Sequence, residues 1–172
     1  MKAEGNELII RHSLDSLAGL KCIRDISPLS SVIDIGSGAG FPGLPLAIFL
    51  QETGFTLLER SSKRAAFLRN VVLLLGLTNV EVVEQELKNL RRGFDLVTFR
   101  ALSPLCREIE SLKAILKHGG RIAAYKGKRS RILQELEELT DRNIPVSIQR
   151  LKAPFLEEDR HLVLLGPILM PS

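Results

Sequence analysis

VIDIGSGAGFPGLPLAI, residues 32–48, is the stretch that decides the fold this sequence predicts. An apolar run with an acid near its end is followed by glycines spaced GxGxG, which is typical of a buried strand leading into a ligand-binding loop. Glycine is needed where the backbone takes a positive φ or where a ligand approaches it closely. The dinucleotide fingerprint is GxGxxG. Here the third glycine comes one residue early, which disfavours a pyrophosphate cradle and favours a cofactor without phosphates.

Strand-like and helical patterns alternate outward from this segment to the end of the chain. Further strands are predicted at residues 55–59, 80–83, 95–99, 121–125, 146–151 and 161–165. Helices are predicted at residues 44–52, 62–75, 104–116 and 131–139. The alternation predicts an α/β fold with a mostly parallel sheet and helices on both faces. The last two strands follow each other without a helix, which predicts an antiparallel hairpin at one edge. A seven-stranded Rossmann-like class I methyltransferase sheet ends in such a pair, whereas a dinucleotide-binding half would continue β-α-β.

Composition narrows the class of protein further. The 172 residues suit one domain, with residues 1–30 as a short helical segment and residues 31–172 as the core. The formal net charge of +4 mildly favours a polyanionic partner. No apolar run reaches the roughly 20 residues that span a bilayer, and the N-terminus lacks a signal-peptide pattern. Cys22 and Cys106 have no metal-ligand spacing. We therefore expect a cytoplasmic protein with reduced thiols, no membrane association, no metal and a monomeric state.

Two acids accompany the glycine loop. Glu59 ends the second predicted strand, 19 residues after Gly40, where a carboxylate can accept hydrogen bonds from both hydroxyls of a ribose. Because NAD and S-adenosylmethionine both carry that ribose, Glu59 does not discriminate between them. Asp34 is expected to hold the loop amides, or alternatively to contact the amino group of a methionine. We assign cofactor-binding roles to Asp34, Gly36, Gly38, Gly40 and Glu59.

Longer motifs carry a family resemblance. The segments HSLDSL, VIDIGSGAGFPGLPLAI, FTLLERSSKRAAFLRNV, FDLVTFRA, GGRIAAYKG and DRHLVLL occur in this order between about residues 12 and 165. In these motifs the chain resembles the 16S ribosomal RNA guanine-N7 methyltransferases (RsmG, also called GidB). The resemblance implies a class I methyltransferase fold, S-adenosylmethionine as cofactor and N7-methylguanosine as product. It also implies 16S rRNA, or the small ribosomal subunit that contains it, as partner.

The resemblance also implies particular cofactor contacts. They fall on Gly36, Phe41, the pair Leu87-Lys88 and Arg100. Lys88 stands where the family usually has an acid, so the adenine contact is expected to use the backbone or to shift to Glu86.

Arg100 is the one residue to which we assign a catalytic role. Guanine N7 carries a free lone pair at neutral pH, so no general base is required and the chemistry depends on positioning and electrostatics. Arg100 follows the fourth predicted strand, where it could contact the methionine carboxylate, the guanine O6 or a phosphate. The alternative is a surface ion pair with Asp95 or a glutamate. His12 and Asp15, three residues apart, are predicted either to cap and pack a helix or to form a lid over the cofactor or RNA.

A basic surface is predicted at the same edge. Cations gather at the start of one predicted helix and acids towards its end, which opposes the helix dipole and indicates a bound polyanion, with a simple solvated face as the alternative. Tyr125 and Phe41 are aromatic candidates for stacking a base, although Phe41 could instead pack under the loop. The residues assigned to RNA binding are Lys63, Arg64, Lys126, Lys128, Arg129 and Arg131.

Three alternatives to an rRNA methyltransferase stay open at this point. A neutral or acidic rim would favour a methyltransferase that acts on a small molecule or a protein. A non-catalytic binding module would not need the intact GxGxG loop and Glu59. An NAD oxidoreductase is the least favoured, because of the glycine spacing and the terminal hairpin.

Overall fold

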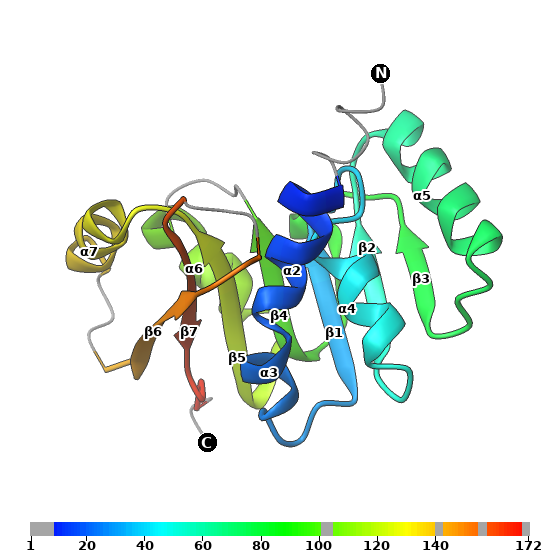
Figure 1. Cartoon of the computed structure of the whole chain (residues 1–172). Helices are drawn as coiled ribbons and strands as arrows, with labels where there is room; N and C mark the ends of the chain where they lie inside the picture. Colours follow the sequence, from blue (N-terminus) through cyan, green and yellow to red (C-terminus); the bar gives the residue numbers. More distant parts are fainter. Residues whose placement is uncertain (1–8, 101–104, 140–142, 155–157, 170–172) are drawn as a thin grey trace.

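A seven-stranded sheet forms the centre of the molecule, with the strand order β3-β2-β1-β4-β5-β7-β6 (Figure 1). The computed structural model describes residues 9–100, 105–139, 143–154 and 158–169. The strands are β1 (Ser31–Ile35), β2 (Gly54–Leu58), β3 (Val80–Val83), β4 (Phe94–Arg100), β5 (Leu116–Lys126), β6 (Val146–Leu151) and β7 (Arg160–Leu165). β1 to β5 pair in parallel, and β7 runs antiparallel to both β5 and β6. The predicted fold, including its terminal hairpin, is confirmed.

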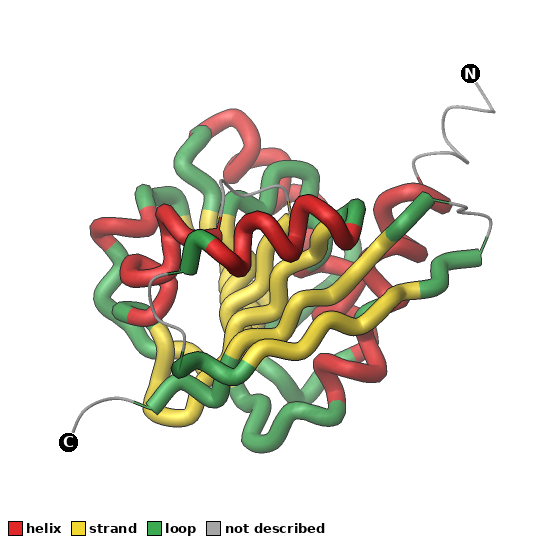
Figure 2. The backbone as a smooth tube through the Cα atoms, turned by 90° about the vertical axis from the view of Figure 1, so that its left-hand side faces the viewer, coloured by secondary structure: helices red, strands yellow, loops and turns green. Residues whose placement is uncertain are grey.

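Helices cover both faces of this sheet (Figures 1 and 2). They are η1 (Ile9–Leu14, a π-helical turn), α2 (Asp15–Ala18), α3 (Leu20–Arg24), α4 (Gly43–Phe49), α5 (Ser62–Leu74), η2 (Leu87–Asn89, a 3-10 turn), α6 (Leu105–Lys113) and α7 (Arg129–Glu137). The N-terminal helices together with α4 and α5 pack on one face, and α6 and α7 pack on the other. The result is the three-layer arrangement expected when a parallel sheet must bury both faces.

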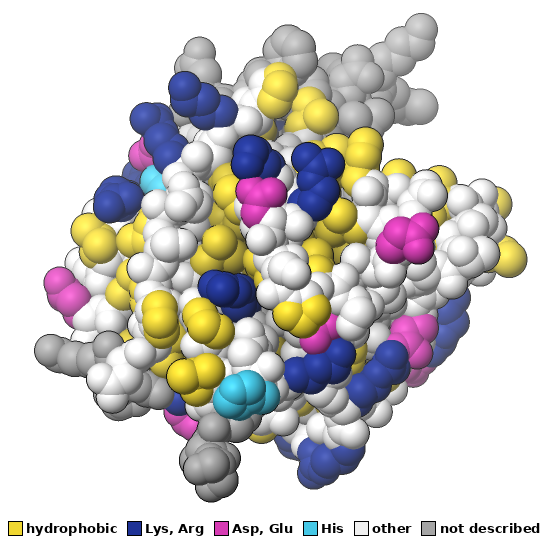
Figure 3. Space-filling model, turned by 90° about the horizontal axis from the view of Figure 1, so that it is seen from below, with side chains coloured by type: hydrophobic (Ala, Val, Ile, Leu, Met, Phe, Trp, Pro, Cys, Tyr) yellow, Lys and Arg dark blue, Asp and Glu magenta, His cyan; other side chains and the backbone are white. Residues whose placement is uncertain are grey.

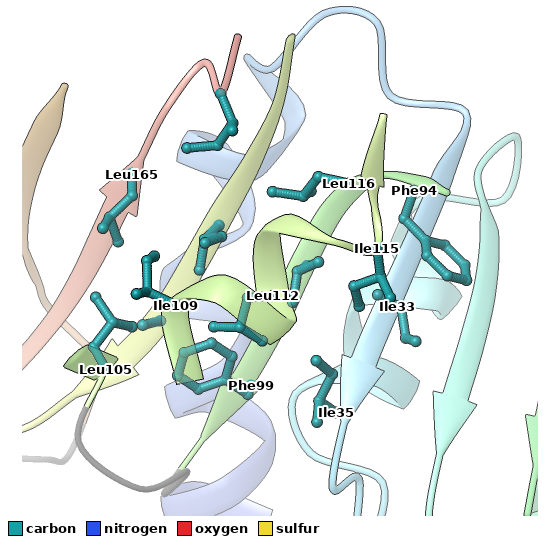
Figure 4. Packing of buried hydrophobic residues seen from close by; sticks show 14 of the residues in the cluster. Ile33, Ile35, Phe94, Phe99, Leu105, Ile109, Leu112, Ile115, Leu116 and Leu165 are labelled. Carbon is teal, nitrogen blue, oxygen red and sulfur yellow. The ribbon is translucent and has the colours of Figure 1, made fainter. Parts of the chain in front are cut away.

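The two cores follow from the alternation of side chains along each strand. In β1, Val32 faces Ile23 of α3 and Leu46 of α4, whereas Ile33 and Ile35 face the α6 side. Figure 4 shows Leu105, Ile109 and Leu112 of α6 packed with Ile33, Ile35, Phe99 and Leu165 in this second core. Each leucine buried in this way contributes roughly 1.5–3 kcal/mol relative to an exposed one.

Helix α5 differs in packing from what its sequence indicates. The apolar residues between Phe67 and Leu75 predict a broad buried face, yet only Ala65 and Leu68 are buried along the helix. Phe67, Leu74 and Leu75 are between 50% and 85% exposed. The helix flanks β3, the outermost strand, so the sheet covers a narrower stripe than the apolar residues span. Gly76, with φ +62, ends the helix as expected.

Segment 114–120 differs from its prediction, which continues the helix to Leu116 and begins the strand at Arg121. The helix ends at Lys113 and β5 begins at Leu116, which pairs with Phe94. The amide of Gly119 donates to the carbonyl of Ile168, and the amide of Ile168 donates to the carbonyl of Gly120, both at 2.8 Å. Pairing with residues far away in the sequence therefore draws this segment into the sheet.

The carboxyl ends of the parallel strands meet at one edge of the sheet. Strand order reverses beside β1, because β2 and β3 lie on one side of it and β4 on the other. Open α/β sheets bind their ligands at such a switch point. The opposite side of the molecule carries cationic, acidic and hydrophobic side chains interspersed with one another (Figure 3).

Candidate functional site

The glycine loop lies directly beyond β1 and leaves room for a ligand at Gly36. Gly36 has φ +64, and a Cβ built on it would meet no atom within 4 Å. At Gly40 a side chain is excluded by the core, because a Cβ there would lie 2.2 Å from the Leu44 side chain. Of the glycines assigned to the cofactor, Gly36 thus borders open space, whereas Gly40 makes room for the core.

Glu59 follows β2 and fixes this loop. Its Oε2 accepts a hydrogen bond from the Gly38 amide at 3.1 Å, and its Oε1 accepts one from the Ser61 amide at 2.9 Å. Arg64 at the start of α5 lies 3.7 Å from Oε2. Each carboxylate oxygen has a second lone pair, so Glu59 can hold the loop and still accept a ligand hydroxyl.

Asp34 lies in β1 beneath the loop and is fully buried. Its Oδ2 accepts a hydrogen bond from the Gly43 amide at 3.0 Å, as expected of a residue that holds the loop. Its Oδ1 has no hydrogen-bond partner among the described residues. Burial raises the pKa of Asp34 to about 7, against the hydrogen bonds from Gly43 and Ser37. An unsatisfied acceptor of this kind suits a cationic or hydrogen-bond-donating ligand.

The open space at Gly36, the acceptors on Glu59 and the unpartnered Asp34 oxygen fit S-adenosylmethionine. Its ribose has two hydroxyls and its amino group is cationic, so acceptors suit both. The loop needs no phosphate-binding arrangement for such a ligand.

Arg100 ends β4 at the same edge and is held by the N-terminal segment. Its Nη1 donates to Asp15 Oδ2 at 3.2 Å, and its Nη2 donates to Nδ1 of His12. Its guanidinium lies 5.8 Å from the ring centre of Phe41, and the His12 ring lies 5.2 Å from the same ring. Burial and the neighbouring Arg100 charge lower the pKa of His12, consistent with a neutral imidazole that accepts this hydrogen bond. Phe41 therefore joins the glycine loop to Arg100.

Asp15 connects this group to the last strand. It is 3% exposed, and its Oδ1 lies 3.2 Å from Nε of Arg160, which begins β7. Arg160 also pairs with Glu158. Burial raises the pKa of Asp15, although the charges of Arg160 and Arg100 act in the opposite direction. His12 and Asp15 share Arg100 as a partner, a contact that neither prediction for this pair included.

A pocket of about 550 Å³ opens beside Arg100. Three of the residues assigned to RNA binding line it, namely Lys126, Lys128 and Arg131. Arg129, in the same helical turn, is not among its lining residues, and neither are Lys63 and Arg64 of α5. Figure 1 shows α5 and α7 at opposite ends of the sheet, so the predicted basic rim is divided into two parts.

Arg11 and Arg160 also line this pocket, and neither is among the predicted site residues. Strand β7 runs antiparallel to β5 and begins where β5 ends, so Arg160 lies beside the end of β5. The predicted hairpin alone does not say which strand it borders, so it could not identify Arg160 as a pocket residue.

Two expectations about side chains are wrong. Tyr125 cannot stack a base, because it is 4% exposed and its hydroxyl donates to the Ser16 carbonyl at 2.6 Å. Arg100 does not pair with Asp95, which lies at the other end of β4. Asp95 accepts hydrogen bonds from Ser30 and Ser31 and lies 3.0 Å from Lys117. The ion pair of Arg100 is with Asp15.

Leu87 and Lys88 form the short turn η2 after β3. Leu87 packs against the α6-side core, and Lys88 makes an exposed ion pair with Glu86 at 2.6 Å. The positive charge at Lys88 is thus matched by an acid two residues earlier.

Neither a metal site nor a membrane helix is found in the part of the chain that the structure describes. No group of three or more His, Cys, Asp or Glu side chains there could hold a metal ion. No helix there is long and apolar enough to cross a bilayer.

Comparison with solved structures confirms the fold. The ribosomal protein L11 methylase of Lactobacillus delbrueckii subsp. bulgaricus aligns with a TM-score of 0.70 at 15% identity, over 89% of this chain and 76% of that one. M. jannaschii TYW2, solved in complex with AdoMet, aligns with a TM-score of 0.65 at 16% identity, over 88% and 74%. The sheet order, the terminal hairpin and the loop at the switch point define a class I methyltransferase fold.

Sequence comparison gives the family. Residues 1–163 match the family described as GidB, rRNA small subunit methyltransferase G. The ribosomal RNA small subunit methyltransferase G of Borrelia garinii subsp. bavariensis is 40% identical over 160 residues, which are 93% of this chain and 76% of that protein. This chain belongs to the rRNA small subunit methyltransferase G family. Membership sets aside the oxidoreductase, the non-catalytic module and a methyltransferase for small molecules or proteins.

Proposed function

We propose that this chain methylates N7 of a guanine in 16S rRNA, with S-adenosylmethionine held against the glycine loop. The observation that carries the proposal is the juxtaposition, at one edge of the sheet, of the open loop at Gly36 and the cation-lined pocket beside Arg100. A nucleoside cofactor fits the loop and a polyanionic substrate fits the pocket. Membership of the family supports the rRNA as that polyanion.

The cofactor-binding residues divide by what they offer. Gly36 gives close backbone approach, and Glu59 offers acceptors for the ribose hydroxyls. Asp34, through its unpartnered Oδ1, suits the cationic amino group. Phe41 closes the loop towards Arg100, and Leu87-Lys88 provides backbone for the adenine.

The bound cofactor supplies a methyl carbon made electrophilic by the sulfonium charge. The protein then has to align guanine N7 with that carbon, because the N7 lone pair needs no base to free it. Arg100 has five N–H donors, and Asp15 and His12 accept two of them. We assign the remaining donors to an oxygen of the guanine or of the methionine carboxylate. Holding that donor set rigid is the contribution of Asp15 and His12.

Mapping of rRNA by mass spectrometry in cells that lack this protein tests the proposal. One N7-methylguanosine of the small subunit should disappear, return with the wild-type chain, and stay absent with Arg100→Ala. An unchanged modification pattern in the deletion strain would contradict the assignment. We place the reaction in the cytoplasm, with the chain acting as a monomer.

A further inference from the structure

The pocket beside Arg100 is a chamber lined by residues from several elements of the chain. It is lined by the N-terminal segment at His12 and Asp15, by the ends of β4 and β5, by α7 and by the start of β7. Its volume of about 550 Å³ lies within the roughly 300–1,000 Å³ of pockets that enclose small ligands. Tyr125, Ile132 and Leu151 give it apolar walls. The loop that leads into α7 is fixed by His161, whose Nδ1 lies 2.7 Å from the Gly127 carbonyl oxygen.

Charge is distributed unequally between the two ends of the pocket. At the buried end, formed by β4 and the N-terminal segment, Arg100 and Arg160 are both compensated by Asp15. At the exposed end, formed by α7, Lys128 and Arg131 have no acid within ion-pair distance among the described residues. Lys126, between the two ends, is paired with Glu135 at 2.7 Å. Lys128 and Arg131 therefore leave positive charge without an acid at the α7 end of this lining.

The start of α7 adds to this charge. Lys128 precedes the helix, and Arg129 and Arg131 fall in its first turn, where the helix dipole is already positive. An anion at this point would be attracted by two side chains and by the dipole together. A phosphate is the anion that a nucleic-acid substrate offers.

The buried end offers an acceptor. Asp15 Oδ1 faces Arg160 as an ion pair without the alignment of a hydrogen bond, and it has no hydrogen-bond partner among the described residues. Arg160 compensates the charge of this oxygen, and its lone pairs remain available to a ligand that donates a hydrogen bond. Guanine has donors at both N1 and N2 on one edge, whereas adenine has only its N6 donor beside an acceptor at N1, which a carboxylate would repel. The acceptor therefore favours guanine over adenine at this end.

We propose that this pocket receives the target guanine nucleotide, with its base at the Asp15 end and its phosphate on Lys128 and Arg131. The proposal rests on the proposed function and names the place and orientation of its substrate. In this orientation the base lies beside Arg100 and Phe41, next to the cofactor loop, while the phosphate marks where the RNA backbone leaves the pocket. The target guanine must be unpaired or extruded to enter.

A titration followed by NMR tests this orientation, with the protein saturated with S-adenosylhomocysteine. The probes are guanosine 5′-monophosphate, guanosine and adenosine 5′-monophosphate. Arg131→Ala and Arg129→Ala form a matched pair, because both remove one exposed arginine from the same helical turn and only Arg131 lines the pocket. A Lys128→Ala, Arg131→Ala double variant removes the whole phosphate site.

We expect the guanine nucleotide to bind the wild type at least about tenfold more tightly than either other probe. The double variant should no longer bind guanosine 5′-monophosphate more tightly than guanosine, and Arg131→Ala should lose part of this preference. The affinity of Arg129→Ala for guanosine 5′-monophosphate should stay within about twofold of the wild type. Equal losses in Arg131→Ala and Arg129→Ala, or equal binding of the two nucleotides, would overturn the proposal. Methylation of rRNA by the wild type, assayed beside the titration, separates such a failure from a failure of the proposed function.

Discussion

The carboxylate of Asp15 accepts a hydrogen bond from Arg100 at 3.2 Å across 85 residues of sequence. This contact joins α2, near the start of the described chain, to the end of the central strand β4. Asp15 also lies against Arg160, so one buried acid holds two arginines from different strands. The N-terminal segment is thereby part of the site, since Arg100 in turn reaches Phe41 of the glycine loop.

Replacing this acid should unfold the protein more easily. Asp15→Asn keeps the shape but leaves two arginines without their shared counter-charge, and breaking a buried pair costs about 3–5 kcal/mol. Urea denaturation measures the loss of unfolding free energy. Asp25→Asn is the control, because its pair with Lys21 is exposed and worth less than about 1 kcal/mol. Similar losses in both variants would show that Asp15 does not hold the two arginines.

Gly36 should be required for the cofactor more than for the fold. Gly36→Ala places a methyl group in open space at φ +64, and Gly76→Ala does the same at φ +62 after α5. Both should lose about 1–2 kcal/mol of stability through the backbone conformation alone. Calorimetry should show S-adenosylmethionine affinity at least about tenfold weaker for Gly36→Ala and unchanged for Gly76→Ala. If the two variants bind the cofactor equally well, the ligand does not approach Gly36.

Glu59→Gln should weaken cofactor binding by about ten- to a hundredfold, because hydrogen bonds to a charged group contribute about 1.5–3 kcal/mol. The amide can still accept from the Gly38 or the Ser61 amide, so part of the loop geometry survives. Calorimetry measures the change. Glu52→Gln, an exposed acid in the turn after α4, should bind like the wild type. If Glu59→Gln binds the cofactor with wild-type affinity, Glu59 does not contact the ribose.

Stability should depend on pH through Asp34, whose pKa is raised to about 7 by burial from 3.8. Between these values the folded protein keeps a proton that the unfolded chain loses, so this contribution falls as pH rises through the window. Asp34→Asn lacks it. From about pH 5 to about pH 8 the wild type should therefore lose on the order of 2–3 kcal/mol more stability than the variant. Parallel pH profiles from urea denaturation would show that Asp34 is ionised throughout.

Much of the fold could be predicted from local patterns. The buried strand before GxGxG, the helix ended by Gly76 and the unbroken succession of the last two strands each depend on residues close in sequence. The extent of β5 could not be predicted, because Leu116 and Gly120 join the sheet through Phe94 and Ile168. The exposure of α5 was missed for a related reason, since helical periodicity does not reveal how much of a helix an edge strand covers.

The candidate site divides in the same way. Asp34 and Glu59 hold the loop, as their places before the glycines and at the end of β2 suggested. The partner of Arg100 could not be read from the sequence, because Asp15 lies 85 residues away and reaches it only through the packing of α2. The basic run in the sequence predicted that the surface near α7 is positively charged, but not which of its cations line the pocket. Lys128 and Arg131 line the pocket, while Arg129 between them does not.

Methyl transfer by the purified chain to small-subunit RNA tests the central claim most directly. With S-adenosylmethionine labelled in its methyl group, the account predicts one labelled nucleoside, N7-methylguanosine, and a loss of labelling in Gly36→Ala that Gly76→Ala does not share. Label on a different nucleoside, or on none while the cofactor is bound, would contradict it.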